Sequence, residues 1–235
     1  MFRLSILAAY FLCALSLSVT AVVAQDRLIS PQEQPTWNAV GRLIEGDIDT
    51  EFGCTATLIA PDLILTAAHC VPLGGADLSA FIFVAGWNRG DYAAISAISE
   101  AHIHPEKTPG PLSYDSVYAD IAILRLSEPL RVPPMPIGNL PDRDIPLAIL
   151  GYRNTTNQAA TLQMRCDHTR FRTSVVAVAC PVHGGNSGSP LVDMTPLGPR
   201  IVSVISAKWG SGALAVRPQD WMADLIPNLP SSNSD

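Results

Sequence analysis

Three segments of the sequence carry side chains that together could perform nucleophilic catalysis. Residues 183–190 read HGGNSGSP and place Ser187 between glycines, which permit a tight turn and leave room for an incoming carbonyl group. Neighbouring backbone N–H groups in such a turn can point into one concavity and stabilise an oxyanion. Because a serine hydroxyl is a weak nucleophile near neutral pH, this chemistry requires a general base within hydrogen-bond distance.

The other two segments supply a base and a carboxylate. His69 lies beside Cys70 in the segment LTAAHC. Asp120 stands at the head of the apolar run DIAILRL, where hydrophobic patterning would otherwise exclude a charge. Burial destabilises a carboxylate unless it is well paired, and an imidazole N–H is a suitable partner because the carboxylate then fixes the tautomer of the ring. We therefore predict that His69, Asp120 and Ser187 act together.

The sequence predicts that the elements which position these residues are short β-strands. Hydrophobic residues make up 48% of the chain and charged residues 15%, with 16 glycines and 20 prolines, which favours short strands joined by tight turns. Apolar and β-branched runs lie on both sides of a Pro-rich stretch, residues 127–146, which is a candidate crossing between two halves. Near the C-terminus, QDWMADLI has apolar residues at helical spacing. We predict two β halves followed by one terminal helix.

The motifs TAAHC, DIAILRL and GNSGSP, in this order, resemble those of the chymotrypsin-like serine peptidase family. The family implies an all-β fold of two six-stranded antiparallel β-barrels with the active site in the crevice between them. On this resemblance, residues 25–235 form a trypsin-like serine peptidase domain. Its parts are an N-terminal barrel at about 37–130, a C-terminal barrel at about 144–217 and a terminal helix at about 218–226.

The resemblance also assigns roles to the candidate catalytic residues. It implies that His69 acts first as general base and then as general acid, that Asp120 orients it, and that Ser187 forms the acyl-enzyme. The backbone N–H groups of Gly185 and Ser187 would form the oxyanion hole. The expected function is a secreted serine endopeptidase that hydrolyses peptide bonds and needs no metal or organic cofactor.

The sequence departs from the family at the residue before the nucleophile. Family members activated by cleavage carry an acidic residue there, which pairs with a newly freed N-terminal ammonium, whereas this chain has Asn186. The GNSGSP variant is more similar to a bacterial branch that includes glutamyl endopeptidases. We therefore expect that no such ion pair switches the protein on.

Specificity is predicted from two further positions of the family pattern. Trypsin-like members keep an aspartate six residues before the nucleophile, and here that position is Pro181, so cleavage after Lys or Arg is not expected. The stretch SAKWGSGALAV resembles the segment that lines the substrate groove, where Ser206 to Gly210 could pair with the substrate backbone as an added strand. Lys208 in this stretch would favour an acidic side chain, although glutamyl peptidases carry a histidine near this point and this chain does not.

The cysteines indicate an oxidising compartment. Cys13 lies in an apolar N-terminal run, and four cysteines remain beyond it: Cys54, Cys70, Cys166 and Cys180. An even number in an exported protein favours two disulfides, and the sequence allows three pairings. Sequential pairing would tie Cys70 to Cys54 and fix the backbone of His69. A zinc site is the alternative, but neither cysteine pair has ligand spacing.

The N-terminus predicts export. Arg3 is followed by the run LSILAAYFLCALSLSVTAVVA, which ends in small residues, so we expect a signal peptide over residues 1–24 with cleavage after Ala24. An uncleaved membrane anchor is the rival interpretation. The mature chain is expected outside the cytoplasm, secreted or periplasmic, away from the membrane and monomeric. Its formal net charge is −6 without any basic run, which argues against nucleic-acid binding.

A second functional hypothesis comes from another class. The chain could be a catalytically silent secreted binding protein on a serine-peptidase scaffold, because a fold does not guarantee an activity. The triad itself discriminates between the two hypotheses, since non-catalytic relatives commonly lose it. The expected partner of an active protein is a protein or peptide substrate.

Overall fold

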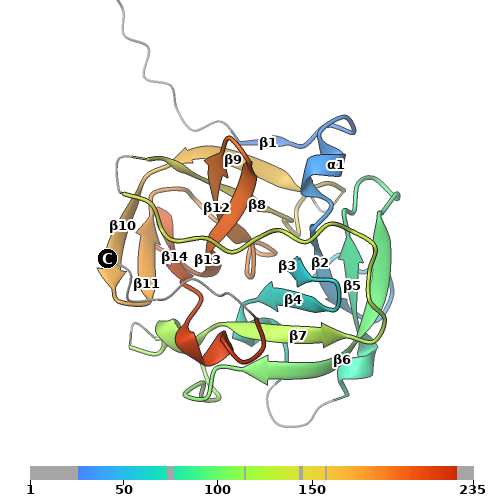
Figure 1. Ribbon diagram of the computed structural model, residues 1–235, viewed down its shortest axis with the longest axis horizontal. Coiled ribbons are helices and arrows are strands. Elements are labelled where there is room, and N and C mark those ends of the chain that lie inside the picture. The colour runs from blue at the N-terminus through green and yellow to red at the C-terminus, as the bar shows by residue number, and fades with distance from the viewer. Residues whose placement is uncertain (1–25, 73–76, 114, 143–144, 157, 227–235) are drawn as a thin grey trace, which may run out of the picture.

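The computed structural model describes residues 26–72, 77–113, 115–142, 145–156 and 158–226, which form two β halves joined by one long connection (Figure 1). The expected signal peptide, residues 1–24, lies outside the described residues. Within these ranges, no helix is both long enough and apolar enough to cross a bilayer.

The first half is a closed barrel of six antiparallel strands in the order β2-β3-β4-β7-β6-β5. The strands are β2 (Val40–Glu45), β3 (Cys54–Ala60), β4 (Leu63–Thr66), β5 (Phe81–Ala85), β6 (Ala94–Ile103) and β7 (Ala122–Leu126). The barrel closes because β2 pairs on one side with β3 and on the other with β5. Four short helices accompany it: α1 (Gln34–Trp37) and the 3-10 helices η1 (Ala68–Cys70), η2 (Leu78–Ala80) and η3 (Val117–Ala119).

The second half is an eight-stranded sheet in the order β1-β9-β8-β12-β13-β14-β11-β10. The strands are β1 (Asp26–Leu28), β8 (Leu147–Gly151), β9 (Thr161–Cys166), β10 (His168–Arg172), β11 (Val175–Val178), β12 (Pro190–Thr195), β13 (Gly198–Trp209) and β14 (Gly212–Val216). The expectation of a second closed six-stranded barrel is therefore corrected. β1 was not predicted from the sequence, and it adds backbone hydrogen bonds to the free edge of β9.

The C-terminal segment also differs from the prediction. In place of a helix over 218–226, the structure has one 3-10 turn, η4 (Asp220–Met222), followed by further turns. Pro218 and Pro227 leave only eight residues between them, and so short a helix has little stability of its own. The segment is held instead by packing: Met222 is fully buried, and the Trp221 ring lies nearly perpendicular to the His104 ring of the first half.

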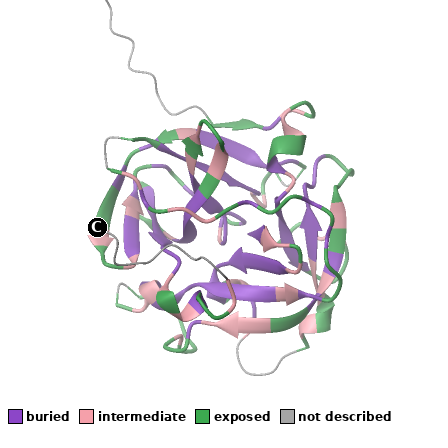
Figure 2. Cartoon of the chain, viewed as in Figure 1, coloured by how far each residue is buried: buried purple, intermediate pink, exposed green. Residues whose placement is uncertain are grey.

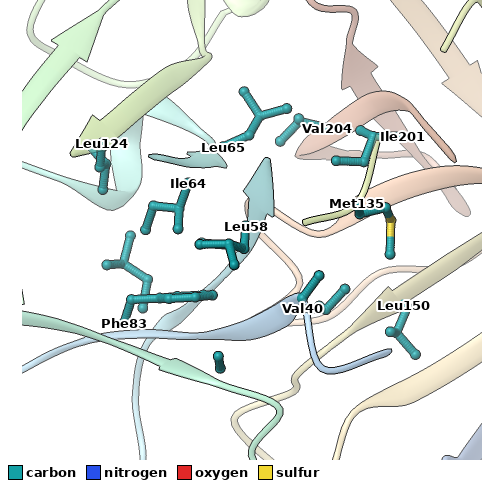
Figure 3. Packing of buried hydrophobic residues seen from close by; sticks show 14 of the residues in the cluster. Val40, Leu58, Ile64, Leu65, Phe83, Leu124, Met135, Leu150, Ile201 and Val204 are labelled. Atoms are coloured by element: carbon teal, nitrogen blue, oxygen red, sulfur yellow. The ribbon is translucent and has the colours of Figure 1, made fainter. Parts of the chain in front are cut away.

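One hydrophobic core runs through both halves. Figure 2 shows buried residues along β4 and β7, whereas β6 is largely exposed or intermediate. In Figure 3, Phe83 and Leu58 of the barrel lie on one side of the cluster, and Leu150 and Ile201 of the second sheet lie on the other. A second cluster joins strands of the second sheet to Leu140 of the connection and to Cys180 and Val182. The shared core fixes the two halves relative to each other, which any site between them requires.

The Pro-rich stretch joins the halves and packs on both. It runs from the end of β7 to the start of β8 and crosses the molecule in Figure 1 as a long yellow-green connection. The Met135 N–H donates to the Leu58 carbonyl of the barrel, and the Gly138 N–H donates to the Ile201 carbonyl of the second sheet. The Met135 side chain is buried in the common core. The connection therefore acts as a structural tie as well as a link in the chain.

The cysteines form two disulfides, Cys54–Cys70 and Cys166–Cys180. This is the sequential pairing, one of the three that the sequence allowed. The first bond joins the start of β3 to the end of η1, beside His69, and the second joins the end of β9 to the segment that leads to Ser187. Both bonds therefore anchor the backbone next to a candidate catalytic residue.

Candidate active site

The pairing of two barrel strands brings His69 and Asp120 together. β4 runs antiparallel to β7, and its last residue, Thr66, pairs with Ala122, the first residue of β7. His69 follows Thr66 in η1, and Asp120 precedes Ala122 at the end of η3, so both lie at the same end of the barrel. The distance between His69 Nδ1 and Asp120 Oδ2 is 2.7 Å, and the His69 backbone N–H donates to Asp120 Oδ1 at 3.0 Å.

Asp120 is completely buried, and both of its carboxylate oxygens accept hydrogen bonds. Besides its two contacts with His69, its Oδ2 accepts a hydrogen bond from Ser206 Oγ at 2.5 Å, and its Oδ1 lies 3.1 Å from Lys107 Nζ. Burial raises the pKa of Asp120, but the hydrogen bonds from His69 and Ser206 and the charge of Lys107 outweigh it and hold the pKa below the usual carboxyl value. The carboxylate is therefore kept ionised beside the imidazole.

This shift predicts acid-dependent stability. Because the folded state lowers the pKa of Asp120, its contribution to stability is fully present above the ordinary carboxyl value of about 3.9 and is lost as the pH falls through the lower folded value. We expect the free energy of unfolding in urea to fall progressively as the pH is lowered below about 4. The Asp120→Asn variant should show a shallower fall; an equally steep one would contradict this assignment.

The loop that carries Ser187 is packed against the segment that leads to His69. Gly188 has a φ of +79°, and a Cβ at this position would lie 2.0 Å from the Thr55 carbonyl oxygen and 2.2 Å from Thr66 Oγ1. No side chain fits there, which explains the glycine. The Ser187 carbonyl oxygen accepts a hydrogen bond from the Thr55 N–H at 2.8 Å. These contacts place Ser187 next to the chain between β4 and His69.

The turn around Ser187 leaves two backbone donors unused. Gly185 adopts a φ of +95°, and its carbonyl oxygen accepts a hydrogen bond from Thr55 Oγ1 at 2.9 Å. Among the residues that the structure describes, neither the Gly185 N–H nor the Ser187 N–H donates to another protein group. These are the two groups that the resemblance assigned to an oxyanion hole. The described contacts also include no hydrogen bond between Ser187 Oγ and His69.

A pocket opens directly beside Ser187. Its volume is about 390 Å³, and its lining combines the loop that carries Ser187 with the end of β13: Val182, His183, Gly184, Asn186, Ser187, Ile205, Ser206, Ala207 and Lys208. Ser206 contributes to this lining while its hydroxyl bonds Asp120. The pocket, the serine and the buried carboxylate therefore form one continuous site.

Comparison with known proteins assigns the chain to a family. A sequence model described as the trypsin-like peptidase domain matches residues 54–196. The chain belongs to the trypsin-like peptidase family. The matched region contains His69, Asp120 and Ser187, and this trypsin-like chain keeps all three within the site described above.

Two individual proteins illustrate the relationship. The chain is 25% identical to a trypsin of Saccharopolyspora erythraea over 190 residues, which cover 70% of this chain and 78% of the relative. A solved structure of a Glu endopeptidase in complex with MPD superposes with a TM-score of 0.67 at 21% identity, covering 86% of this chain and 94% of that one. The structural match supports the chymotrypsin-like fold of this trypsin-like peptidase.

The trypsin-like domain presents an open strand edge beside the pocket. Residues Ile205 to Trp209 of β13 pair on one side with β14, whereas the pairing of β13 with β12 ends at Val204. Within the described part of the chain, no strand pairs with the other edge of residues 206–208. An extended peptide could bind there by adding a strand, with one of its side chains in the pocket.

The predicted pocket residues separate into two groups. Ser206 and Lys208 line the pocket, whereas Pro181 and Gly210 lie outside its lining. Pro181 is exposed, and its carbonyl oxygen accepts a hydrogen bond from the Gln163 amide. His183, an exposed residue that the sequence analysis did not assign to the pocket, also lines it.

The geometry also shows site residues that sequence reasoning missed. The Ser206 hydroxyl was expected only as part of a substrate-binding strand, yet it bonds Asp120. Lys107 and Thr55 were not considered. Thr55 directly follows Cys54, and its hydroxyl links the Gly185 carbonyl oxygen to the Tyr152 N–H. The sequence offers only a polar residue in a buried strand as a signal for Thr55, and this does not identify its hydrogen-bond partners.

The sulfurs beside His69 are not available as metal ligands. Cys54, His69 and Cys70 place three potential ligand atoms within 4.8 Å of one another. The two sulfurs are bonded to each other, whereas zinc binds cysteine as the thiolate. The arrangement fits a disulfide that anchors His69 better than a zinc site.

Asn186 occupies the place of the acidic residue that cleavage-activated relatives use. Its side chain is buried; its Nδ2 donates to the Tyr152 carbonyl oxygen and its Oδ1 accepts from the His183 N–H, both at 3.0 Å. Both ends of the amide are thus hydrogen-bonded to the backbone around the loop that carries Ser187. This network needs no ammonium group to hold the loop in place.

Asn186→Asp is expected to destabilise the protein by about 3 kcal/mol at neutral pH, because the introduced carboxylate would face the Tyr152 carbonyl oxygen without a donor. The loss should shrink as the pH falls and the carboxyl group gains a proton that it can donate. Urea unfolding at several pH values measures this effect. Unchanged stability at neutral pH would mean that another group compensates the charge.

Proposed function

We propose that this chain is an exported serine endopeptidase that uses His69, Asp120 and Ser187 as a catalytic triad. The single observation that carries the proposal is the buried Asp120 carboxylate, bonded to both Nδ1 and the backbone N–H of His69. A carboxylate in this position fixes the tautomer of the ring, so that Nε2 is free to accept a proton from a serine hydroxyl. Membership in the trypsin-like peptidase family supports the same assignment.

In the proposed reaction, His69 removes the proton of Ser187 as its Oγ attacks the carbonyl carbon of the scissile peptide bond. The negative charge that develops on the carbonyl oxygen is stabilised by the N–H groups of Gly185 and Ser187. His69 then gives its proton to the leaving amine, which leaves an acyl-enzyme on Ser187. A water molecule, activated by the same histidine, releases the acid and restores the serine.

The pocket supports a preference for acidic side chains in the substrate. Its lining includes the exposed Lys208 and His183 and contains no carboxylate among the described residues. A basic substrate side chain would meet Lys208, whereas an acidic one would be attracted to it. The solved structure that this chain resembles is titled a Glu endopeptidase. We therefore propose cleavage after acidic residues and not after Lys or Arg.

Lys208→Glu is expected to reverse this preference. The ratio of kcat/KM for acidic over basic substrates should fall by about 10- to 100-fold, since each charge in the pocket contributes about 1–3 kcal/mol to discrimination. Lys208→Gln, which only removes the charge, should give an intermediate ratio. Peptide-library profiling measures all three proteins, and a library in which neutral residues dominate for the unaltered protein would refute the acidic preference.

The proposed protein needs no insertion of a new N-terminus into the nucleophile loop. The reason is the network around Asn186, whose amide is already satisfied by the backbone. Export follows from the predicted signal peptide, and the two disulfides are consistent with an oxidising compartment. We expect the chain that begins at Gln25 to be active without further cleavage, which activity of the protein purified in that form would test.

Peptide cleavage by the purified mature protein tests the proposed function. Incubation with a library of synthetic peptides, followed by mass spectrometry, should reveal internal cleavage that is lost in the Ser187→Ala protein. The silent binding-protein hypothesis predicts no cleavage by either protein. In that case a peptide would bind along the open edge of β13 and be recovered intact.

A further inference from the structure

Lys107 is buried against the proposed catalytic aspartate. Only 5% of its side chain is exposed, and its Nζ lies 3.1 Å from Asp120 Oδ1. A lysine so deeply buried is uncommon unless it is paired, and the ordinary role of Asp120 in the triad does not require a cation. Asp120 already receives three hydrogen bonds from His69 and Ser206.

A fixed turn holds Lys107 in this position. The Lys107 N–H donates to the His104 carbonyl oxygen at 2.9 Å, and the Glu106 N–H donates to His104 Nδ1 at 3.1 Å. Since Nδ1 accepts this hydrogen bond, His104 carries its proton on Nε2, which donates to Gln219 Oε1 at 3.0 Å. The His104 ring, 6% exposed, packs nearly perpendicular to the rings of Tyr118 and Trp221.

Two other ionisable residues, Glu106 and Asp220, lie in or beside the turn that carries Lys107. Glu106 accepts a hydrogen bond from the Tyr118 hydroxyl group of η3. Asp220 is the ionisable residue of η4, which packs on the turn through Trp221. Lys107 forms an ion pair with Asp120, a carboxylate that it shares with His69 of η1.

Sharing the carboxylate affects the chemistry of the histidine. During the reaction, the charge of Asp120 stabilises the imidazolium form of His69. A cation on the other oxygen of the same carboxylate offsets part of that charge and disfavours the imidazolium. Lys107 therefore favours the neutral imidazole of His69, the form that acts as the base, over the imidazolium.

We propose that Lys107 is a positioning residue of this site, which holds Asp120 in register with His69 and extends activity toward acidic pH. The inference rests on the proposed function, because it requires His69 to act as the general base. Lys107 itself does not touch the reacting atoms. The turn anchored by His104 positions the ammonium group of Lys107 beside Asp120.

The test measures the rate at which a fluorophosphonate probe labels Ser187 between pH 4.5 and pH 8.5, which requires no knowledge of the substrate. For Lys107→Met and Lys107→Gln, we expect the midpoint of the acid limb to rise by about 0.5 to 1 pH unit. A shift of one unit means roughly tenfold slower labelling at pH values below both midpoints. Lys107→Arg, which keeps the charge, is expected to restore the acid limb.

The variants separate this inference from the alternatives. Arg125→Met removes a cation that pairs with Asp62 and Glu100 on the same barrel, and it should leave the acid limb unmoved. A purely structural role of Lys107 predicts equal slowing at every pH, with no shift of the midpoint, and that result would overturn the proposal. If only one of Lys107→Met and Lys107→Gln folds, the pH profile of labelling measured on that variant decides between the two outcomes. Failure of the unaltered protein to label at any pH would instead contradict the proposed function.

Discussion

Ser187→Ala is expected to lower the rate of peptide hydrolysis by about 10⁴- to 10⁶-fold, and His69→Ala should cause a loss of similar size. The reason is that the serine cannot attack without the base and the base has no other nucleophile to activate. The double variant should therefore be hardly slower than either single variant. Measurement of kcat/KM on one cleaved peptide gives all three values.

A neighbouring serine provides the matched control. Ser189 lies two residues beyond Ser187, and its hydroxyl is buried without a hydrogen-bond partner among the described residues. Ser189→Ala removes an unsatisfied polar group and should leave the rate within a few-fold of the unaltered protein. Losses that add up across the Ser187 and His69 variants would show that the two residues act independently, contrary to the proposed triad.

Asp120→Asn is expected to reduce kcat/KM by about 10⁴-fold. The amide can direct an N–H toward His69 Nδ1, which forces the proton of the ring onto Nε2 and leaves no acceptor for the Ser187 hydroxyl group. It also removes the charge that stabilises the imidazolium. Because Lys107 would lose its buried partner, the folded fraction must be measured in parallel by active-site labelling and by thermal unfolding.

Asp193→Asn is the matched control for this substitution. Asp193 lies on β12 of the second sheet, outside the proposed triad, and forms a 3.6 Å ion pair with Arg200. A surface ion pair of this kind contributes little to stability, so the Asp193→Asn protein should retain the kcat/KM of the unaltered protein. If folded Asp120→Asn protein lost less than tenfold in kcat/KM, Asp120 would not be the residue that orients His69.

The parts of the site that could be predicted are those fixed by local sequence or by one strand pair. The isolated charge at the head of β7 indicated that Asp120 is buried and paired, and the glycines around Ser187 indicated a tight turn. Both disulfides follow one of the pairings that the cysteine count allowed. In each case a single residue type imposes a strong physical constraint, which a reader of the sequence can recognise.

The missed features depend on contacts between segments that are distant in sequence. Lys107 lies in an irregular turn, and its sequence neighbours do not indicate that its side chain is buried against Asp120. This burial depends on how His104 packs against η4. β1 is polar and joins the sheet only through the free edge of β9. The helical spacing of the C-terminal run was a misleading signal, since apolar residues in a short segment between prolines can equally be buried by turns.

The most direct test of the central claim is stoichiometric labelling of the purified mature protein with a fluorophosphonate, followed by mass spectrometry of its peptides. The account predicts one phosphonyl group per molecule, located on Ser187, with labelling abolished in Ser187→Ala and retained in Ser189→Ala. Labelling is expected without prior cleavage. Absence of an adduct on folded protein, or an adduct on a different residue, would contradict the assignment of Ser187 as an activated nucleophile.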